Sequence, residues 1–178
     1  MQLQPISRPA PSVAATGALP SLTSEIRCLG QGDRAALAAH LISLPPRDRR
    51  TRFGGNSGDE AIRRHCDDLD LEETICFAAF DEAGDMIGAA LGFTYGAGAG
   101  HHHQVAEIAV SVAPDHRRRG LGADLVACVC GTVVARGAIA AVFEFDPSNV
   151  AIRGLIRHLG GRVAPLADSC TIPLSTQH

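Results

Sequence analysis

The segment 105–122, VAEIAVSVAPDHRRRGLG, has the residue types and spacing of an anion-binding turn. A β-rich run ends at Pro114, three consecutive arginines follow, and Gly120 and Gly122 stand one residue apart at the start of an Ala- and Val-rich helix. Glycines let backbone N–H groups approach a ligand closely, and a helix N-terminus favours negative charge. The pattern predicts a diphosphate site, although glycines at a helix start also serve packing alone.

The same segment resembles the signature of the GNAT superfamily of N-acetyltransferases, Arg/Gln-x-x-Gly-x-Gly/Ala, which Arg117, Gly120 and Gly122 match. The likeness continues through FEFDPSN at 143–149 and ends at LGG, 159–161. Upstream, LPPRDRRTRFG at 44–54 is similar to a segment of GNAT domains of the bacterial protein lysine acetyltransferase type. Arg52 and Phe53 carry that second match; a solvated run of arginines is the alternative.

The resemblance implies that acetyl-CoA is the co-substrate. Its pyrophosphate would lie on the backbone amides of the turn, and its pantetheine arm would lie between a splayed fourth and fifth strand, paired with the fourth. The cofactor-binding residues implied in this way are Val110, Ser111, Val112, Arg117, Arg118, Arg119, Gly120, Leu121, Gly122, Ala123 and Asn149.

Glu107 is the candidate general base. Direct acetyl transfer to a primary amine requires the amine to be neutral, because an ammonium ion has no lone pair for attack. Glu107 falls in the predicted fourth strand, where several GNAT enzymes carry their base. A strand glutamate that faces water or a neighbouring arginine is the alternative interpretation.

Two positions depart from the family pattern. Many members carry a tyrosine in the last helix that protonates the CoA thiolate, and the matching residue here is Ile156. The phenylalanine that usually ends the motif is replaced by Gly161, which predicts weaker local packing. The sequence therefore supports an acetyltransferase acting on a small-molecule amine or a protein lysine, with a non-catalytic acyl-CoA-binding or sensor domain as the alternative.

No metal site is predicted. His101, His102 and His103 are adjacent in a Gly-rich stretch, and adjacent residues of a strand point to opposite faces. A loop near the acceptor pocket is the better interpretation of this triplet. Cys128 and Cys130 diverge by about 200° on a helix and are predicted to be core thiols.

The elements that must position these residues follow from local patterns. Strands are predicted at 25–29, 73–80, 86–95, 105–112, 140–145 and within 162–173, and helices at 34–43, 59–69, from 120 to about 136, and 149–159. Pro45 and Pro46 end the first helix, so 47–58 is predicted to be a loop, as is 96–104. This order indicates a mixed sheet with helices on both faces. The fold class is α/β (α+β), and the resemblance implies the GNAT fold: a mostly antiparallel sheet of six or seven strands with splayed fourth and fifth strands.

Length and composition bound the remaining expectations. The 178 residues suit one domain, assigned to 22–175, after a disordered tail at 1–21. A net charge of −3 gives no global basic field for nucleic acid or an anionic membrane. The longest apolar stretch, 125–135, is too short to span a bilayer. Six cysteines without a disulfide framework indicate reduced thiols in a cytoplasmic protein. The oligomeric state stays open, a homodimer included.

Overall fold

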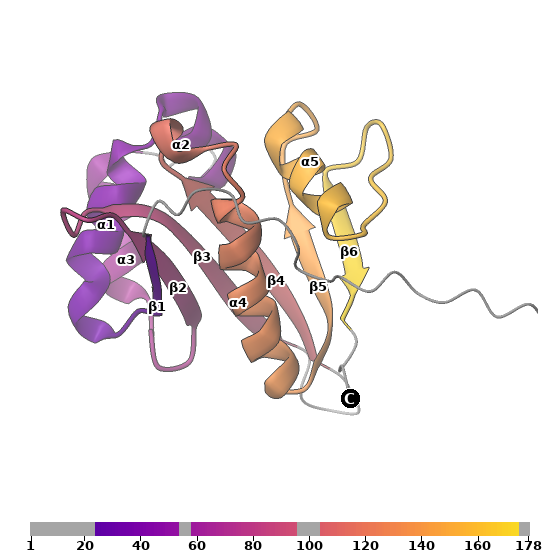
Figure 1. Cartoon of the computed structure of the whole chain (residues 1–178), viewed down its shortest axis with the longest axis horizontal. Helices are drawn as coiled ribbons and strands as arrows, with labels where there is room; N and C mark the ends of the chain where they lie inside the picture. Colours follow the sequence, from indigo (N-terminus) through magenta and orange to yellow (C-terminus); the bar gives the residue numbers. More distant parts are fainter. Residues whose placement is uncertain (1–23, 54–57, 96–103, 175–178) are drawn as a thin grey trace, which may run out of the picture.

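The computed structural model describes residues 24–53, 58–95 and 104–174, which form a six-stranded sheet flanked by helices (Figure 1). The strands are β1 (Glu25–Cys28), β2 (Ile75–Phe80), β3 (Met86–Tyr95), β4 (Gln104–Val112), β5 (Ala138–Glu144) and β6 (Ser169–Pro173). The helices are α1 (Arg34–Ser43), α2 (Pro46–Phe53), α3 (Asp59–Asp68), α4 (Leu121–Ala135) and α5 (Val150–His158), with 3₁₀ turns η1 (Gln31–Asp33) and η2 (Pro114–His116).

The strands lie in chain order, and every neighbouring pair is antiparallel except β4 and β5. The parallel pairing of β4 with β5 stops at Glu107, whereas β4 remains paired with β3 as far as Val112. Beyond Glu107 the fourth and fifth strands therefore separate. The mixed, mostly antiparallel sheet and its splayed strands confirm the predicted fold class.

Alternation along the strands divides the core between the two faces of the sheet. Ile75 and Ala79 of β2 pack in the cluster that contains α4, whereas Cys76 and Ala78 pack with α1 and α3. Successive side chains of a strand point to opposite faces, so one apolar strand serves both layers. In Figure 1, α4 crosses the face of the sheet formed by β2, β3 and β4.

The close approach of α4 depends on a glycine of β3. A Cβ atom added at Gly92 would lie 2.6 Å from Cγ1 of Val129 and 3.2 Å from Cγ1 of Val133. Both valines are fully buried on α4. Because Gly92 has no side chain, α4 can lie this close to the sheet. Helix α4 is the helix that follows the predicted anion-binding turn.

The prediction of a loop from residue 47 to 58 was wrong for its first part, because α2 occupies Pro46–Phe53. Pro46 stands at the first helical position, where proline is favoured because its missing N–H would be unpaired there anyway. Asp48 in the first turn and Arg52 in the last turn also suit the helix dipole. The two prolines therefore end one helix and begin another.

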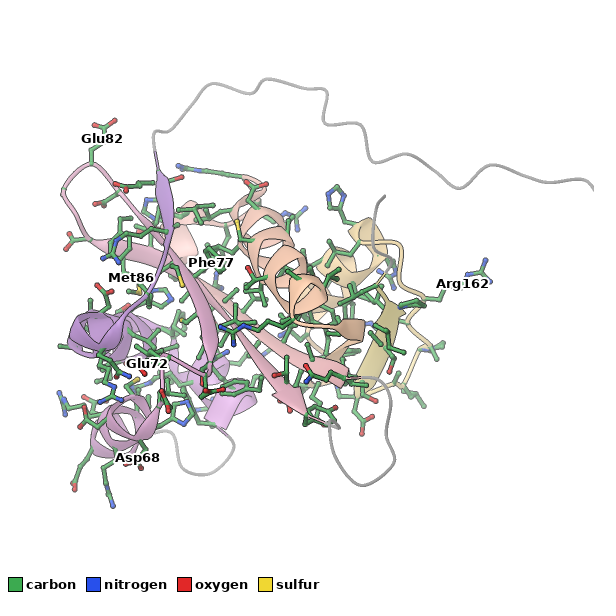
Figure 2. The ribbon with its side chains drawn as sticks, turned by 90° about the horizontal axis from the view of Figure 1, so that it is seen from below. Asp68, Glu72, Phe77, Glu82, Met86 and Arg162 are labelled. Atoms are coloured by element: carbon green, nitrogen blue, oxygen red, sulfur yellow. The ribbon has the colours of Figure 1, made fainter. Side chains whose placement is uncertain are left out.

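The remaining predicted elements are present, with shifted ends. The closing strand covers only Ser169–Pro173, and the residues between α5 and β6 form a loop that Arg153 anchors by donating to the carbonyl oxygen of Ala164 at 2.9 Å. Figure 2 shows Arg162 in this loop and Glu82 in the β2–β3 turn, at opposite sides of the molecule.

Several predictions fall wholly or partly outside the described residues: the tail at 1–21, the part of the predicted 47–58 loop at 54–57, the histidines at 101–103, the Gly-rich stretch that contains them, and both ends of the domain assigned to 22–175. In the ranges that the structure does describe, no helix has the length and apolar character needed to cross a membrane. No group of three or more His, Cys, Asp or Glu side chains in those same ranges could hold a metal ion.

Candidate functional site

The turn between β4 and α4 has unusual backbone geometry. Arg118 has φ 63° and Gly120 has φ 88°, so two residues of one short turn adopt left-handed conformations. The backbone N–H groups of residues 118–122 donate to no other group that the structure describes. A run of unpaired N–H groups at the start of a helix forms an anion-binding concavity. The geometry therefore fits the diphosphate that the sequence predicts.

The three arginines of the turn have different surroundings. Arg117 is turned back on the protein: its Nε donates to the carbonyl oxygen of Val112 at 2.9 Å, and its Nη2 pairs with Asp48 of α2 at 2.5 Å. Arg118 lines the cleft described below, and Arg119 does not. Of the three predicted cations, Arg118 is thus the one left available to a ligand in the cleft.

A cleft of about 1090 Å³ lies between the separated halves of β4 and β5. That volume is at the upper end of ligand pockets, which are roughly 300–1,000 Å³. Its walls come from β4, the turn, the first residues of α4, the end of β5, α5 and α2. All predicted site residues except Arg119 line it, namely Glu107, Val110, Ser111, Val112, Arg117, Arg118, Gly120, Leu121, Gly122, Ala123 and Asn149.

The β4 backbone beyond Glu107 borders this cleft. Residues 108–112 pair with β3 on one side and have no β5 partner on the other. In an antiparallel pair, alternate residues direct their N–H and C=O groups away from the partner strand. This edge can therefore pair with an extended polar ligand. Asn149, across the cleft, caps α5 by accepting a hydrogen bond at Oδ1 from the N–H of Ile152 at 3.2 Å.

Glu107 lies where β4 and β5 separate. Its side chain is half-buried, lines the cleft and makes no hydrogen bond or ion pair with any residue in the described ranges. A carboxylate so placed can accept a proton from a group bound in the cleft. The role of Glu107 as the general base stays a prediction.

Helix α2 contacts residues on both sides of the cleft. Arg47 donates to Oγ of Ser148, in the β5–α5 loop, at 3.0 Å, and Asp48 pairs with Arg117 of the turn. Thr51 and Arg52 of the same helix line the cleft. Because the sequence pattern did not show this helix, its contribution to the wall was not predicted, although proline at the first helical position was the available signal.

A buried histidine also supports the site, and sequence reasoning missed it. His40 of α1 is 3% exposed; its Nδ1 lies 3.2 Å from the carbonyl oxygen of Met86 and its Nε2 lies 3.0 Å from Oγ of Ser111. A carbonyl only accepts, so Nδ1–H donates to Met86 and the Ser111 hydroxyl donates to Nε2. Burial lowers the pKa of His40 to about 4, which keeps the ring neutral.

The two departures from the family pattern have structural consequences. Ile156 is fully buried in the core and is not part of the cleft wall. At Gly161, a Cβ atom would lie 2.6 Å from Cγ2 of Ile156 and 3.1 Å from Cδ1 of Ile172, so the backbone itself packs closely there. A larger residue does not fit at 161. His116 and His158, which were not predicted as site residues, also line the cleft.

Comparison with known proteins supports this description. Residues 44–160 match the family model described as the acetyltransferase (GNAT) family. A search of curated proteins gave no significant match. Among solved structures, the GNAT domain of PAT from S. lividans has a TM-score of 0.70 at 18% identity, over 85% of this chain and 90% of that one.

Two further structures were solved with acetyl-CoA. The Salmonella typhimurium protein yncA has a TM-score of 0.65 at 17% identity, over 88% of this chain and 96% of that one. A phosphinothricin acetyltransferase from Sinorhizobium meliloti has a TM-score of 0.62 at 16% identity, over 85% and 89%. At these identities the likeness establishes a shared fold.

Proposed function

The chain belongs to the acetyltransferase (GNAT) family, and on that premise we propose that it transfers an acetyl group from acetyl-CoA to a primary amine. The acceptor amine belongs to a small molecule or to a protein lysine. We assign this activity to a single domain, residues 22–175, which contains the family match and all the described elements.

The observation that carries this proposal is the set of five backbone N–H groups at residues 118–122, which have no partner among the described residues and lie at one end of a cleft whose other end holds Glu107. The turn amides and Arg118 would hold the pyrophosphate. The free edge of β4 at 108–112 and Asn149 would hold the pantetheine arm. Two of the proteins with similar folds were solved with acetyl-CoA.

In the proposed reaction, acetyl-CoA supplies the activated thioester. Glu107 takes one proton from the acceptor ammonium, so that the nitrogen regains its lone pair. A carbon–nitrogen bond then forms at the acyl carbon as the carbon–sulfur bond breaks, and the new amide nitrogen loses its second proton to solvent. Unpaired backbone N–H groups along β4 can stabilise the negative charge that develops on the carbonyl oxygen. Ile156 offers no proton, so the departing sulfur takes its proton from solvent or from another group that lines the cleft.

The direct test is release of free thiol from acetyl-CoA in the presence of an amine panel, with wild type and Glu107→Gln compared. We expect the variant to lose about 10²–10⁴-fold in kcat, the usual contribution of a general base, with unchanged affinity for acetyl-CoA. Glu73→Gln is the matched control, since Glu73 is exposed and lies outside the cleft wall.

Wild-type protein that binds acetyl-CoA and releases no thiol with any amine would instead identify a non-catalytic acyl-CoA-binding domain. The buried Ile156, in place of a tyrosine, is the feature that would favour that function. A Glu107→Gln variant with full turnover would exclude Glu107 as the base and leave acetyl transfer standing.

A further inference from the structure

Arg52 differs from two other arginines of α2 in its surroundings. Arg47 donates to Ser148 at 3.0 Å, and Arg49 forms an ion pair with Asp59 at 2.6 Å. Arg52 makes no hydrogen bond and no ion pair with any residue in the described ranges; its guanidinium carbon lies 5.6 Å from the centroid of the Phe53 ring. The side chain is half-buried and lines the cleft. Its counter-ion is therefore not supplied by the part of the protein that the structure describes.

This placement is energetically unfavourable without a ligand. A cation withdrawn from water without a hydrogen-bonded partner loses solvation that nothing replaces. Burial accordingly lowers the pKa of Arg52, opposed mainly by the neighbouring thiols of Cys76 and Cys66 and the carboxylate of Glu107. A guanidinium with its donors unused, open to a ligand cleft, is suited to an anionic group that arrives with the ligand.

Glu107 provides the complementary charge. It projects from β4, whereas Arg52 projects from α2, and both border the same cleft. The charge of Glu107 acts to raise the pKa of Arg52, and no ion pair joins the two side chains. A ligand in this part of the cleft therefore meets one cation and one anion, each without another partner among the described residues.

We propose that the acceptor amine also carries a carboxylate, as a free amino acid does, and that Arg52 binds this carboxylate while the amino group faces Glu107. The inference rests on the proposed acetyl transfer and specifies its acceptor class. A planar guanidinium matches a carboxylate with two parallel hydrogen bonds. The same positive charge repels an amine that lacks a carboxylate, so Arg52 both attracts the zwitterion and disfavours plain amines and protein lysines.

Arg52 takes no part in bond making. Glu107 removes one proton from the ammonium, the nitrogen attacks the acyl carbon, and the products are an N-acetyl amino acid and CoA. Arg52 holds the carboxylate throughout, which fixes the amino group relative to Glu107. Arg52 is therefore a specificity-determining and positioning residue. Its loss raises KM and removes the discrimination between amino acids and amines without a carboxylate.

The test measures thiol release from acetyl-CoA with the standard amino acids, their α-carboxamides and a blocked lysine peptide. With wild type, we expect kcat/KM for at least one amino acid to be at least about tenfold higher than for its carboxamide. A factor of about ten is what the loss of one hydrogen bond between charged groups costs. Arg52→Gln should lose about 10- to 100-fold on that amino acid, mainly through KM, with the preference for the acid abolished. Its affinity for acetyl-CoA should be unchanged.

Two further variants control for folding and charge. Arg52→Lys keeps the charge without the planar fork, and should retain part of the preference for acids. Arg50→Gln changes an exposed arginine of the same helix that is not part of the cleft wall, and should behave as wild type. A melting temperature measured for each variant identifies any that lose their structure.

The inference is overturned while acetyl transfer stands if the carboxamides or the lysine peptide are acetylated as well as the amino acids. It is also overturned if Arg52→Gln keeps the wild-type preference. If acetyl-CoA binds and no member of this panel is acetylated, the inference is overturned, and the broader amine panel described above then decides whether the protein transfers acetyl groups to any amine.

Discussion

His40 connects α1 to two strands through both nitrogens of one ring. Its Nδ1–H donates to Met86 at the start of β3, and its Nε2 accepts from Ser111 of β4. Ser111 lies in the β4 stretch that borders the cleft. A protonated ring would have no acceptor for the serine hydroxyl. The neutral form of His40 therefore supports the strand on which the proposed cofactor contacts depend.

Stability should fall as the pH is lowered from about 6.5 to about 4. In this window the unfolded chain protonates His40 near its ordinary pKa of 6.5, while burial keeps the folded pKa at about 4. The unfolded state then binds more protons, so acid favours unfolding. At about 1.4 kcal/mol per pH unit, the gap corresponds to about 3 kcal/mol.

Urea unfolding across this window, with wild type and His40→Gln compared, measures the effect. The variant should be less stable near neutral pH and should lose the part of the pH dependence that His40 contributes. His158→Gln, which removes an exposed histidine, should keep the wild-type slope. A His40→Gln protein with the full wild-type slope would show that other groups are responsible.

Among the elements, the packing of α4 on β3 fixes the position of the anion-binding turn at the carboxyl end of β4. Gly92→Ala should destabilise the fold by about 1–3 kcal/mol, because the added Cβ would overlap the rigid, buried side chain of Val129. Denaturant unfolding measures the change.

Gly131→Ala is the matched control on α4. A Cβ atom there meets nothing within 4 Å, and the residue is exposed within the helix. Alanine should therefore leave stability unchanged or raise it by up to about 1 kcal/mol through its helix propensity. Equal stability of Gly92→Ala and wild type would contradict the account of close packing.

Local sequence patterns predicted some elements better than others. The strands and α4 have apolar runs and turn residues that indicate them directly. Helix α2 buries no residue and has no apolar face, so its sequence resembles a solvated loop. Its contacts are with distant residues instead: Arg47 with Ser148 and Asp48 with Arg117. Such contacts leave no periodic signal in the chain.

The same distinction applies to the site. The turn was predictable because adjacent residues make it, whereas Glu107 was proposed from the resemblance to GNAT enzymes that carry their base in the same strand. The positions of His40 and Arg52 depend on how α1 and α2 pack against β4, which spacing along the chain does not reveal. The one predicted site residue that does not reach the cleft, Arg119, sits among three arginines whose directions the sequence does not distinguish.

The cleft of the folded molecule forms where β4 separates from β5. Three parts of the chain complete its wall: helix α2, the turn before α4, and the β5–α5 loop with α5. Helix α2 joins the turn at Arg117 and the β5–α5 loop at Ser148. The chain has a net charge of −3, so attraction of an anionic cofactor must come from local groups. Among the described residues, the unpaired amides of the turn and the side chain of Arg118 are such local groups.

Titration calorimetry with acetyl-CoA shows whether the turn binds this cofactor, using wild type, Gly120→Ala and Gly84→Ala. Both glycines have similar left-handed φ, 88° and 84°, so alanine strains both turns alike, but only Gly120 borders the cleft. We expect wild type and Gly84→Ala to bind with similar affinity and Gly120→Ala to bind at least about tenfold more weakly, about 1.4 kcal/mol. Absence of binding by folded wild type, or equal binding by the two variants, would contradict the assignment of the turn as the acetyl-CoA site.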